Sequence, residues 1–119
     1  MTAPEPWPKS LHYRRAERAL AITFEDGSHF VLPAEYLRVE SPSAEVQGHG
    51  GDTKQIVPGK AGVTITAIEP VGRYAVRLVF DDGHDSGLYT WRYLHELGRE
   101  RDARWQRYLN ALAAKGLPR

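Results

Sequence analysis

The chain has 119 residues, of which 41% are hydrophobic and 26% charged, values typical of a single globular domain. Sixteen basic residues against fifteen acidic ones give a net charge of +1, which favours neither a nucleic acid nor an anionic membrane as partner. The lack of cysteine excludes disulfides, thiolate zinc sites and thiol nucleophiles. With no apolar run of membrane-spanning length and no signal-peptide pattern, we expect a cytoplasmic protein.

Residues 1–10 are predicted to form a disordered or loosely docked tail, because three prolines fall within the first eight positions. Trp7 is expected to cover an edge of the core. Apolar residues then alternate with polar ones over residues 20–24 and 30–32, with Asp26-Gly27 between the two runs. An Asp-Gly pair in this position predicts a β-hairpin.

The second half of the chain repeats this pattern. Alternation returns over residues 63–67 and 74–80, and Asp82-Gly83 forms the next predicted turn. We interpret the similarity as shared turn chemistry rather than as a duplication. Between the halves, residues 33–37 predict a turn or one helical turn. Residues 41–62 predict a long loop with a short strand at 55–57, and loops of this length are commonly functional.

Helices are predicted at the end of the chain. Thr90 is a suitable N-cap for residues 91–97, and Gly98 is placed as the left-handed residue that ends this helix. A longer helix is predicted over residues 100–114 and ends before Gly116. The expected class is therefore α+β, a small antiparallel β-sheet of two hairpin-containing halves followed by two C-terminal helices.

Two loops carry candidate chemistry. The glycines around His49 could cradle an anion, but their spacing does not fit a P-loop, and a flexible loop tip is the simpler interpretation. The segment from His84 to Ser86 contains His, Asp and Ser, yet consecutive strand residues point to opposite faces and cannot form a relay. None of the five histidines forms a known metal-binding pair. If a metal binds, we expect His49, His84 and Asp85 as its ligands.

The tryptophans and tyrosines are interleaved with arginines, a pattern that could stack on single-stranded nucleic acid. Acidic residues are equally frequent and no basic stripe is present, so we assign most of these aromatic residues to the core.

Two stretches resemble the gamma-butyrobetaine hydroxylase-like N-terminal domain family. One runs from Leu32-Pro33 through Ser41-Pro42-Ser43 to Val46, and the other contains Asp82-Gly83-His84 and Tyr89-Thr90-Trp91-Arg92. The resemblance covers residues 11–98 and leaves 99–119 as a C-terminal helix packed on that domain. In hydroxylases of carnitine synthesis the domain precedes an oxygenase domain and holds a structural zinc, and it is also appended to P-loop iron–sulfur carriers.

The resemblance places the zinc ligands, three cysteines and a histidine, on Ser41, Ser43, Val46 and His84. Serine and valine cannot replace cysteine there, so the chain is expected to have a degenerate zinc site and no cofactor. As a hypothesis, Ser41, Ser43 and Glu45 bond to His84 or to nearby backbone and hold the same two segments together. The candidate binding residues are Arg38, Ser41, Ser43, Glu45, His49, His84, Asp85 and Trp91.

The leading functional prediction is a monomeric, non-enzymatic binding or accessory module that acts through another protein. Iron–sulfur protein assembly is the partner system that the resemblance implies. The alternative is a metal- or anion-binding protein that uses the His49 and His84 loops, with zinc or iron as the metal. An enzyme ranks last, because the chain shows no complete catalytic set of residues.

Overall fold

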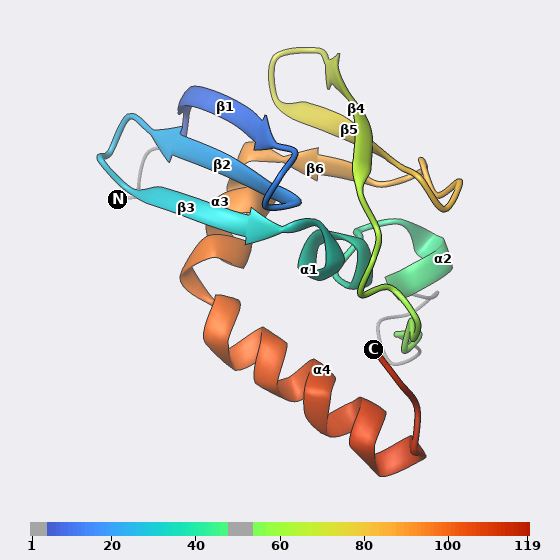
Figure 1. Cartoon of the computed structure of the whole chain (residues 1–119). Helices are drawn as coiled ribbons and strands as arrows, with labels where there is room; N and C mark the ends of the chain where they lie inside the picture. Colours follow the sequence, from blue (N-terminus) through green and yellow to red (C-terminus); the bar gives the residue numbers. More distant parts are fainter. Residues whose placement is uncertain (1–4, 48–53) are drawn as a thin grey trace.

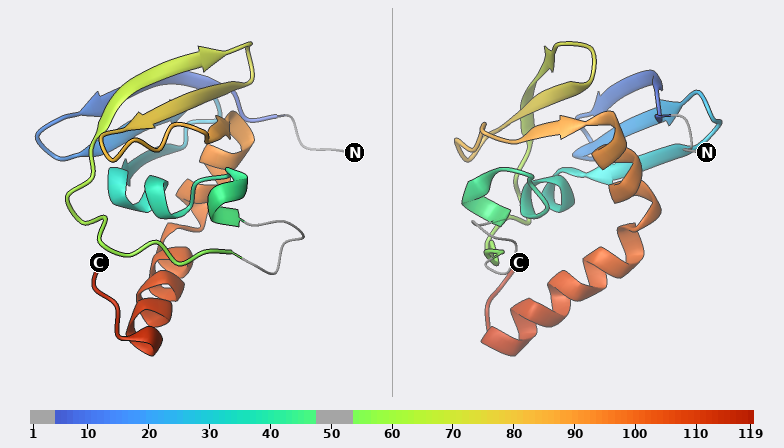
Figure 2. Two further views of the ribbon diagram at one scale, coloured as in Figure 1. Left: turned by 90° about the vertical axis from the view of Figure 1, so that its right-hand side faces the viewer. Right: turned by 180° about the vertical axis from the view of Figure 1, so that it is seen from behind.

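A computed structural model describes residues 5–47 and 54–119. In chain order the elements are β1 (Pro8–Arg14), β2 (Ala19–Phe24), β3 (His29–Pro33), α1 (Ala34–Val39), α2 (Ala44–Gln47), β4 (Ile65–Val71), β5 (Ala75–Phe80), β6 (Leu88–Thr90), α3 (Trp91–Arg99) and α4 (Arg101–Lys115). The strands form two antiparallel sheets, ordered β1-β2-β3 and β4-β5-β6 (Figure 1). Both sheets lie on one side of the molecule and the helices on the other (Figure 2). The predicted α+β class is confirmed.

The two predicted hairpin turns are confirmed and are built alike. Gly27 and Gly83 both have φ of 91°, a conformation that glycine adopts without strain. The Asp26 carboxylate accepts the backbone N–H of Ser28 at 2.8 Å, and the Asp82 carboxylate accepts that of His84 at 3.0 Å. The side chain before each glycine therefore fixes the turn, as Asx-turn chemistry requires.

The first strand begins at Pro8, within the segment predicted to be a tail. Pro8 pairs with Phe24 across the sheet, and the amide of Glu25 donates to the carbonyl of Trp7 at 2.9 Å. Backbone pairing at the start of β1 therefore holds these residues on the sheet.

One hydrophobic core joins the two sheets to the helices. Its largest fully buried side chains include Phe24, Tyr36, Phe80 and Tyr89. Burying an apolar side chain of this size contributes roughly 1.5–3 kcal/mol. The strands of the two sheets do not pair with each other, so the shared core holds the sheets together in one domain.

The two halves also exchange equivalent hydrogen bonds between their helices. The Tyr36 hydroxyl of α1 donates to the carbonyl of Leu97 in α3 at 2.7 Å. In return, the Tyr93 hydroxyl of α3 donates to the carbonyl of Glu40, just after α1, at 2.5 Å. The similarity of the halves therefore extends beyond the turns, which shared turn chemistry alone does not explain.

The helices at the end of the chain follow the prediction, except at Gly98. Thr90 caps α3, since its hydroxyl accepts the Tyr93 amide at 3.0 Å, and Gly116 ends α4 with φ of 64°. The expected left-handed role of Gly98 is wrong, because α3 continues to Arg99. A Cβ at Gly98 would lie 2.3 Å from the Phe30 ring, so glycine is needed there for close packing.

The loop between the halves differs from its prediction. Its first part contains the short helix α2, and residues 55–57 are not a strand. The amide of Gln55 instead donates to the carbonyl of Val46, the third residue of α2. Because the neighbour of residue 55 is a short helix and not a strand, residues 55–57 have no strand with which to pair.

Candidate functional site

The buried imidazole of His84 joins two distant segments. His84 follows the β5–β6 turn, and its Nε2 lies 2.8 Å from Oγ of Ser41 and 3.4 Å from Oγ of Ser43. All three residues are buried. The contact expected from the sequence between these serines and His84 is therefore present.

The second ring nitrogen of His84 lies beside an exposed carboxylate. Nδ1 of His84 lies 3.3 Å from Oε2 of Glu45, whose side chain is 71% exposed. The Ser86 hydroxyl donates to the same carboxylate at 3.2 Å. A carboxylate beside Nδ1 favours a proton on that nitrogen, which leaves Nε2 to accept the Ser41 hydroxyl.

Burial lowers the pKa of His84 below its ordinary value of 6.5, and the nearby Arg38 guanidinium lowers it further. Glu45 and Asp82 oppose this shift without reversing it. The imidazole is therefore neutral at pH 7, and both of its nitrogens are engaged by neighbouring side chains. These contacts connect the loop after α1 to the turn between β5 and β6.

Asp82 ties the turn to helix α1. Its carboxylate accepts hydrogen bonds from Nε of Arg38 at 2.8 Å and from Nζ of Lys60 at 2.7 Å. Burial opposes the ionisation of Asp82, but hydrogen bonds from Lys60, the His84 amide and Arg38 outweigh it and lower its pKa to about 2. Asp82 is therefore ionised at neutral pH and holds the Arg38 side chain in place.

Close packing at Gly87 completes this site. A Cβ at that position would lie 2.6 Å from Oγ of Ser41 and 3.0 Å from Cε1 of Tyr89. Real Cβ atoms essentially never approach another atom to 2.6 Å, so a side chain at this position would push the Ser41 hydroxyl away from His84.

The zinc site implied by the family resemblance does not fit these residues. Val46 is buried and has no ligand atom, and the two serines offer neutral hydroxyls that zinc binds poorly. The imidazole nitrogens are already engaged by Ser41 and Glu45. Among residues 5–47 and 54–119 no group of three His, Cys, Asp or Glu side chains could hold a metal ion. The prediction that the chain needs no cofactor remains a prediction.

The remaining candidate residues lie elsewhere. Asp85 pairs with Arg77 at 3.3 Å on the surface. The Trp91 indole N–H donates to the carbonyl of Arg73 at 2.7 Å, at the start of α3. His49 lies outside the described residues. The structure thus brings together Arg38, Ser41, Ser43, Glu45 and His84, and places Trp91 in a different pocket.

That second pocket is an aromatic groove of about 340 Å³, which we define by Trp7, Tyr74 and Trp91. Trp7 is 46% exposed and Tyr74 57% exposed, so these two are not among the aromatic residues buried in the core. Their exposure could not be predicted from alternation, because Trp7 precedes β1 and Tyr74 lies in the turn before β5.

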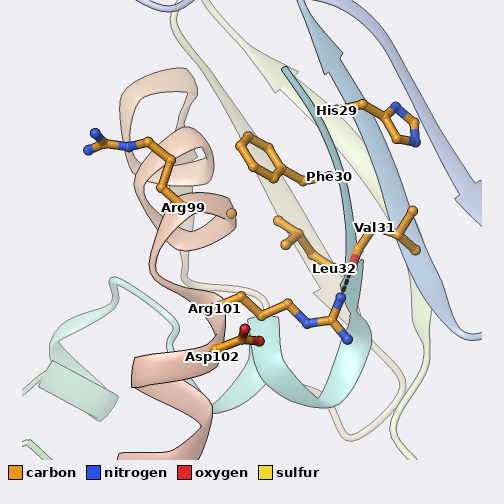
Figure 3. A pocket seen from close by; sticks show the side chains of 8 residues that line it. His29, Phe30, Val31, Leu32, Arg99, Arg101 and Asp102 are labelled. Carbon is orange, nitrogen blue, oxygen red and sulfur yellow. Dashed lines mark hydrogen bonds between the residues drawn. The ribbon is translucent and has the colours of Figure 1, made fainter.

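A third pocket, of about 210 Å³, lies where α3 and α4 meet strand β3. Figure 3 shows His29 and Arg99 on opposite sides of this pocket, pointing away from each other. Arg101 is engaged by the carbonyl of Val31 at 2.8 Å. Because these charged groups do not converge, we do not assign a site there.

The comparisons agree with the architecture. Residues 11–95 match the family described as "Gamma-butyrobetaine hydroxylase-like, N-terminal". The chain belongs to this family. The match covers most of the chain and concerns an N-terminal domain, not a hydroxylase catalytic domain. No curated protein matches the chain.

Solved structures extend the likeness over nearly the whole chain. Two NMR solution structures are each 45% identical, with TM-scores of 0.85 and 0.83; they cover 98% and 100% of this chain and 91% of their own. A crystal structure of a protein of unknown function from Acidithiobacillus ferrooxidans, assigned to the DUF971 family, is 37% identical with a TM-score of 0.68. That alignment covers 82% of this chain and 98% of the other. Separately, every helix in the described part of the chain is too short or too polar to cross a bilayer.

Proposed function

We propose that this chain is a non-enzymatic accessory module that binds a partner protein through the aromatic groove. The observation that carries the proposal is the exposure of Trp7 and Tyr74 beside Trp91. Tryptophan and tyrosine are enriched among the residues that dominate protein–protein binding energy. A fully buried aromatic side chain covers about 150–250 Å², and about half of the surface of Trp7 and of Tyr74 is still exposed and available to a partner.

The site around His84 supports the same proposal by its chemistry. Ser41 is fully buried and His84 nearly so, which leaves neither side chain open to a substrate from solvent. Ser41 and His84 instead fix the loop after α1 to the β5–β6 turn. Exposed neighbours such as Glu45 and Asp85 remain accessible at the surface and are proposed as further partner contacts.

We further propose iron–sulfur protein assembly as the partner system, because the resemblance of this chain implies an association with P-loop iron–sulfur carriers. This part of the proposal rests on association within the family and not on a feature of the groove.

Binding to a purified P-loop iron–sulfur carrier, measured by isothermal titration calorimetry, tests both parts. We expect saturable binding that Tyr74→Ser weakens at least about fivefold, the loss typical of an interface residue worth more than 1 kcal/mol. Leu117→Ser is the matched control, because Leu117 is an exposed apolar residue outside the groove. Binding that tolerates Tyr74→Ser would overturn the groove, and no binding would overturn the partner system.

A further inference from the structure

The aromatic groove is partly filled by the chain itself. Residues 5–7 line one side of it, while Tyr74, Trp91 and Arg92 line the other. The Glu5 carboxylate accepts Nε of Arg92 at 3.0 Å and pairs with its terminal nitrogen as well. An acidic residue followed by a proline, Glu5-Pro6, is thus held against the start of α3 by an arginine and aromatic rings.

This internal contact is weakly held and can be exchanged. The side chains of Glu5 and Arg92 are 64% and 66% exposed, and exposed ion pairs contribute little to stability. The firm backbone attachment comes only at Trp7, whose carbonyl accepts the Glu25 amide. A second carboxylate could therefore replace Glu5 on Arg92 without disturbing strand β1.

The groove also has unused hydrogen-bond donors. The indole N–H of Trp7 and the hydroxyl of Tyr74 bond to none of the described residues. Donors set between aromatic rings suit the carbonyls of a polyproline II segment, whose backbone has no internal hydrogen bonds. Proline rings pack on aromatic faces, and the preformed helix loses little entropy on binding.

The charges at the groove favour an acidic ligand. Arg92 is the basic residue in the lining of the pocket, and it pairs with the exposed Glu5 carboxylate. Glu5 is the single acidic residue lining the pocket. When Glu5 is displaced, Arg92 is left as the one charged residue of the lining, and a carboxylate of a partner segment would neutralise it.

We propose that the groove binds an acidic, proline-rich segment of a partner protein, whose carboxylate takes the place of Glu5 on Arg92 while its prolines pack on Tyr74 and Trp91. This inference rests on the proposed function and names the chemistry of the partner at the same groove. The tail at Glu5 then acts as an internal competitor for the site.

The test is a titration of the ¹⁵N-labelled chain with the capped peptide Pro-Pro-Glu-Pro-Pro, followed at the indole N–H signals of Trp7 and Trp91. We expect saturable shifts at both indoles. The matched peptide with Gln in place of Glu should bind about fivefold more weakly, the effect of one exposed ion pair. The peptide with glycines in place of the prolines should not bind.

Variants assign the contacts. Arg92→Gln should remove the difference between the Glu and Gln peptides, Glu5→Gln should strengthen binding of the Glu peptide, and Tyr74→Ser should weaken both peptides. Leu117→Ser should change neither, since it lies outside the groove. Spectra of the free variants confirm that each one folds.

Three results would overturn the inference: no indole shifts, equal binding of the glycine peptide, or preference for an amphipathic helical peptide. If the peptides fail while the carrier protein still loses affinity on Tyr74→Ser, the inference fails and the proposed function stands. If the carrier also tolerates Tyr74→Ser, both fail.

Discussion

The imidazole of His84 connects the loop after α1 to the turn between β5 and β6 through contacts with Ser41 and Ser43. Replacing it with alanine removes the acceptor of the Ser41 hydroxyl and leaves a void beside Phe80, whose ring lies 6.1 Å from the imidazole. We expect His84→Ala to lower the free energy of unfolding by about 2 kcal/mol. Urea unfolding measures this. His12→Ala, at an exposed position, should have no effect, and an unchanged His84→Ala stability would contradict the role given to His84.

The same residue predicts how stability depends on pH. The pKa of His84 is lowered in the folded state from an ordinary value of 6.5, so the unfolded chain takes up a proton first as the pH falls. The contribution of His84 is complete above pH 6.5 and declines as the pH drops through the window between 6.5 and the folded pKa. Unfolding of the wild type and of His84→Asn is compared from pH 7.5 to pH 5.5, and the free energy of unfolding should fall more steeply in the wild type. Parallel curves would disprove it.

Gly87 gives a purely steric test at this site. Alanine would bring a Cβ within 2.6 Å of Oγ of Ser41 and force that hydroxyl away from His84. We expect Gly87→Ala to destabilise the fold by about 1–3 kcal/mol through overpacking. Gly62→Ala is the control, since its Cβ would meet nothing within 4 Å and its φ is not left-handed. Equal melting temperatures for the two variants would exclude the steric explanation.

At the scale of elements, helix α4 is held by a small core of its own and by a clasp. Val39, Tyr108 and Leu112 form that core, separate from the main one. The clasp is Arg119, which donates to the buried Glu35 carboxylate at 2.7 Å and lies over the ring of Trp105. The end of the chain thereby fastens α4 to α1.

Opening this clasp should loosen α4 first. Arg119→Ala leaves the Glu35 carboxylate buried without its partner, at a cost of about 1 kcal/mol because Arg119 is itself half exposed. Trp105 fluorescence should shift to the red and proteolysis of α4 should accelerate, while Lys115→Ala leaves both unchanged. Glu35→Gln should reduce the penalty of Arg119→Ala, since it removes the stranded charge. Unaltered fluorescence in Arg119→Ala would show that the clasp is dispensable.

Elements with local determinants could be predicted from the sequence. Asp26-Gly27, Asp82-Gly83 and the Thr90 cap each act within a few residues, so their patterns are sufficient. The role of Gly98 in helix α3 could not be predicted, because glycine is needed there to make room for the Phe30 ring of strand β3. The expected strand at residues 55–57 failed for a similar reason, as pairing needs a neighbour that the fold does not place there.

The candidate site divides in the same way. The serines and His84 could be predicted to meet only through the family resemblance, because 43 residues separate Ser41 from His84 and no local pattern connects them. The aromatic groove could not be predicted, since periodicity assigns an aromatic residue to a face but does not say whether another element covers that face. Tyr74 shows the difference, for it lies in the turn before β5 and stays exposed.

For the whole molecule, we expect the shared core and the reciprocal tyrosine contacts to make the two halves unfold together. The two sheets share no strand pairing, so cooperativity between the halves depends on the common core and on Tyr36 and Tyr93, which cross-link α1 and α3. Tyr36→Phe and Tyr93→Phe should each cost about 1 kcal/mol, the value of a buried hydrogen bond, and should retain one transition. Far-ultraviolet circular dichroism and tryptophan fluorescence should report the same midpoint in the wild type and in each variant. Two separated transitions in the wild type would mean that the halves fold independently. Separated transitions in the variants alone would mean that the tyrosines, and not the shared core, couple the two halves.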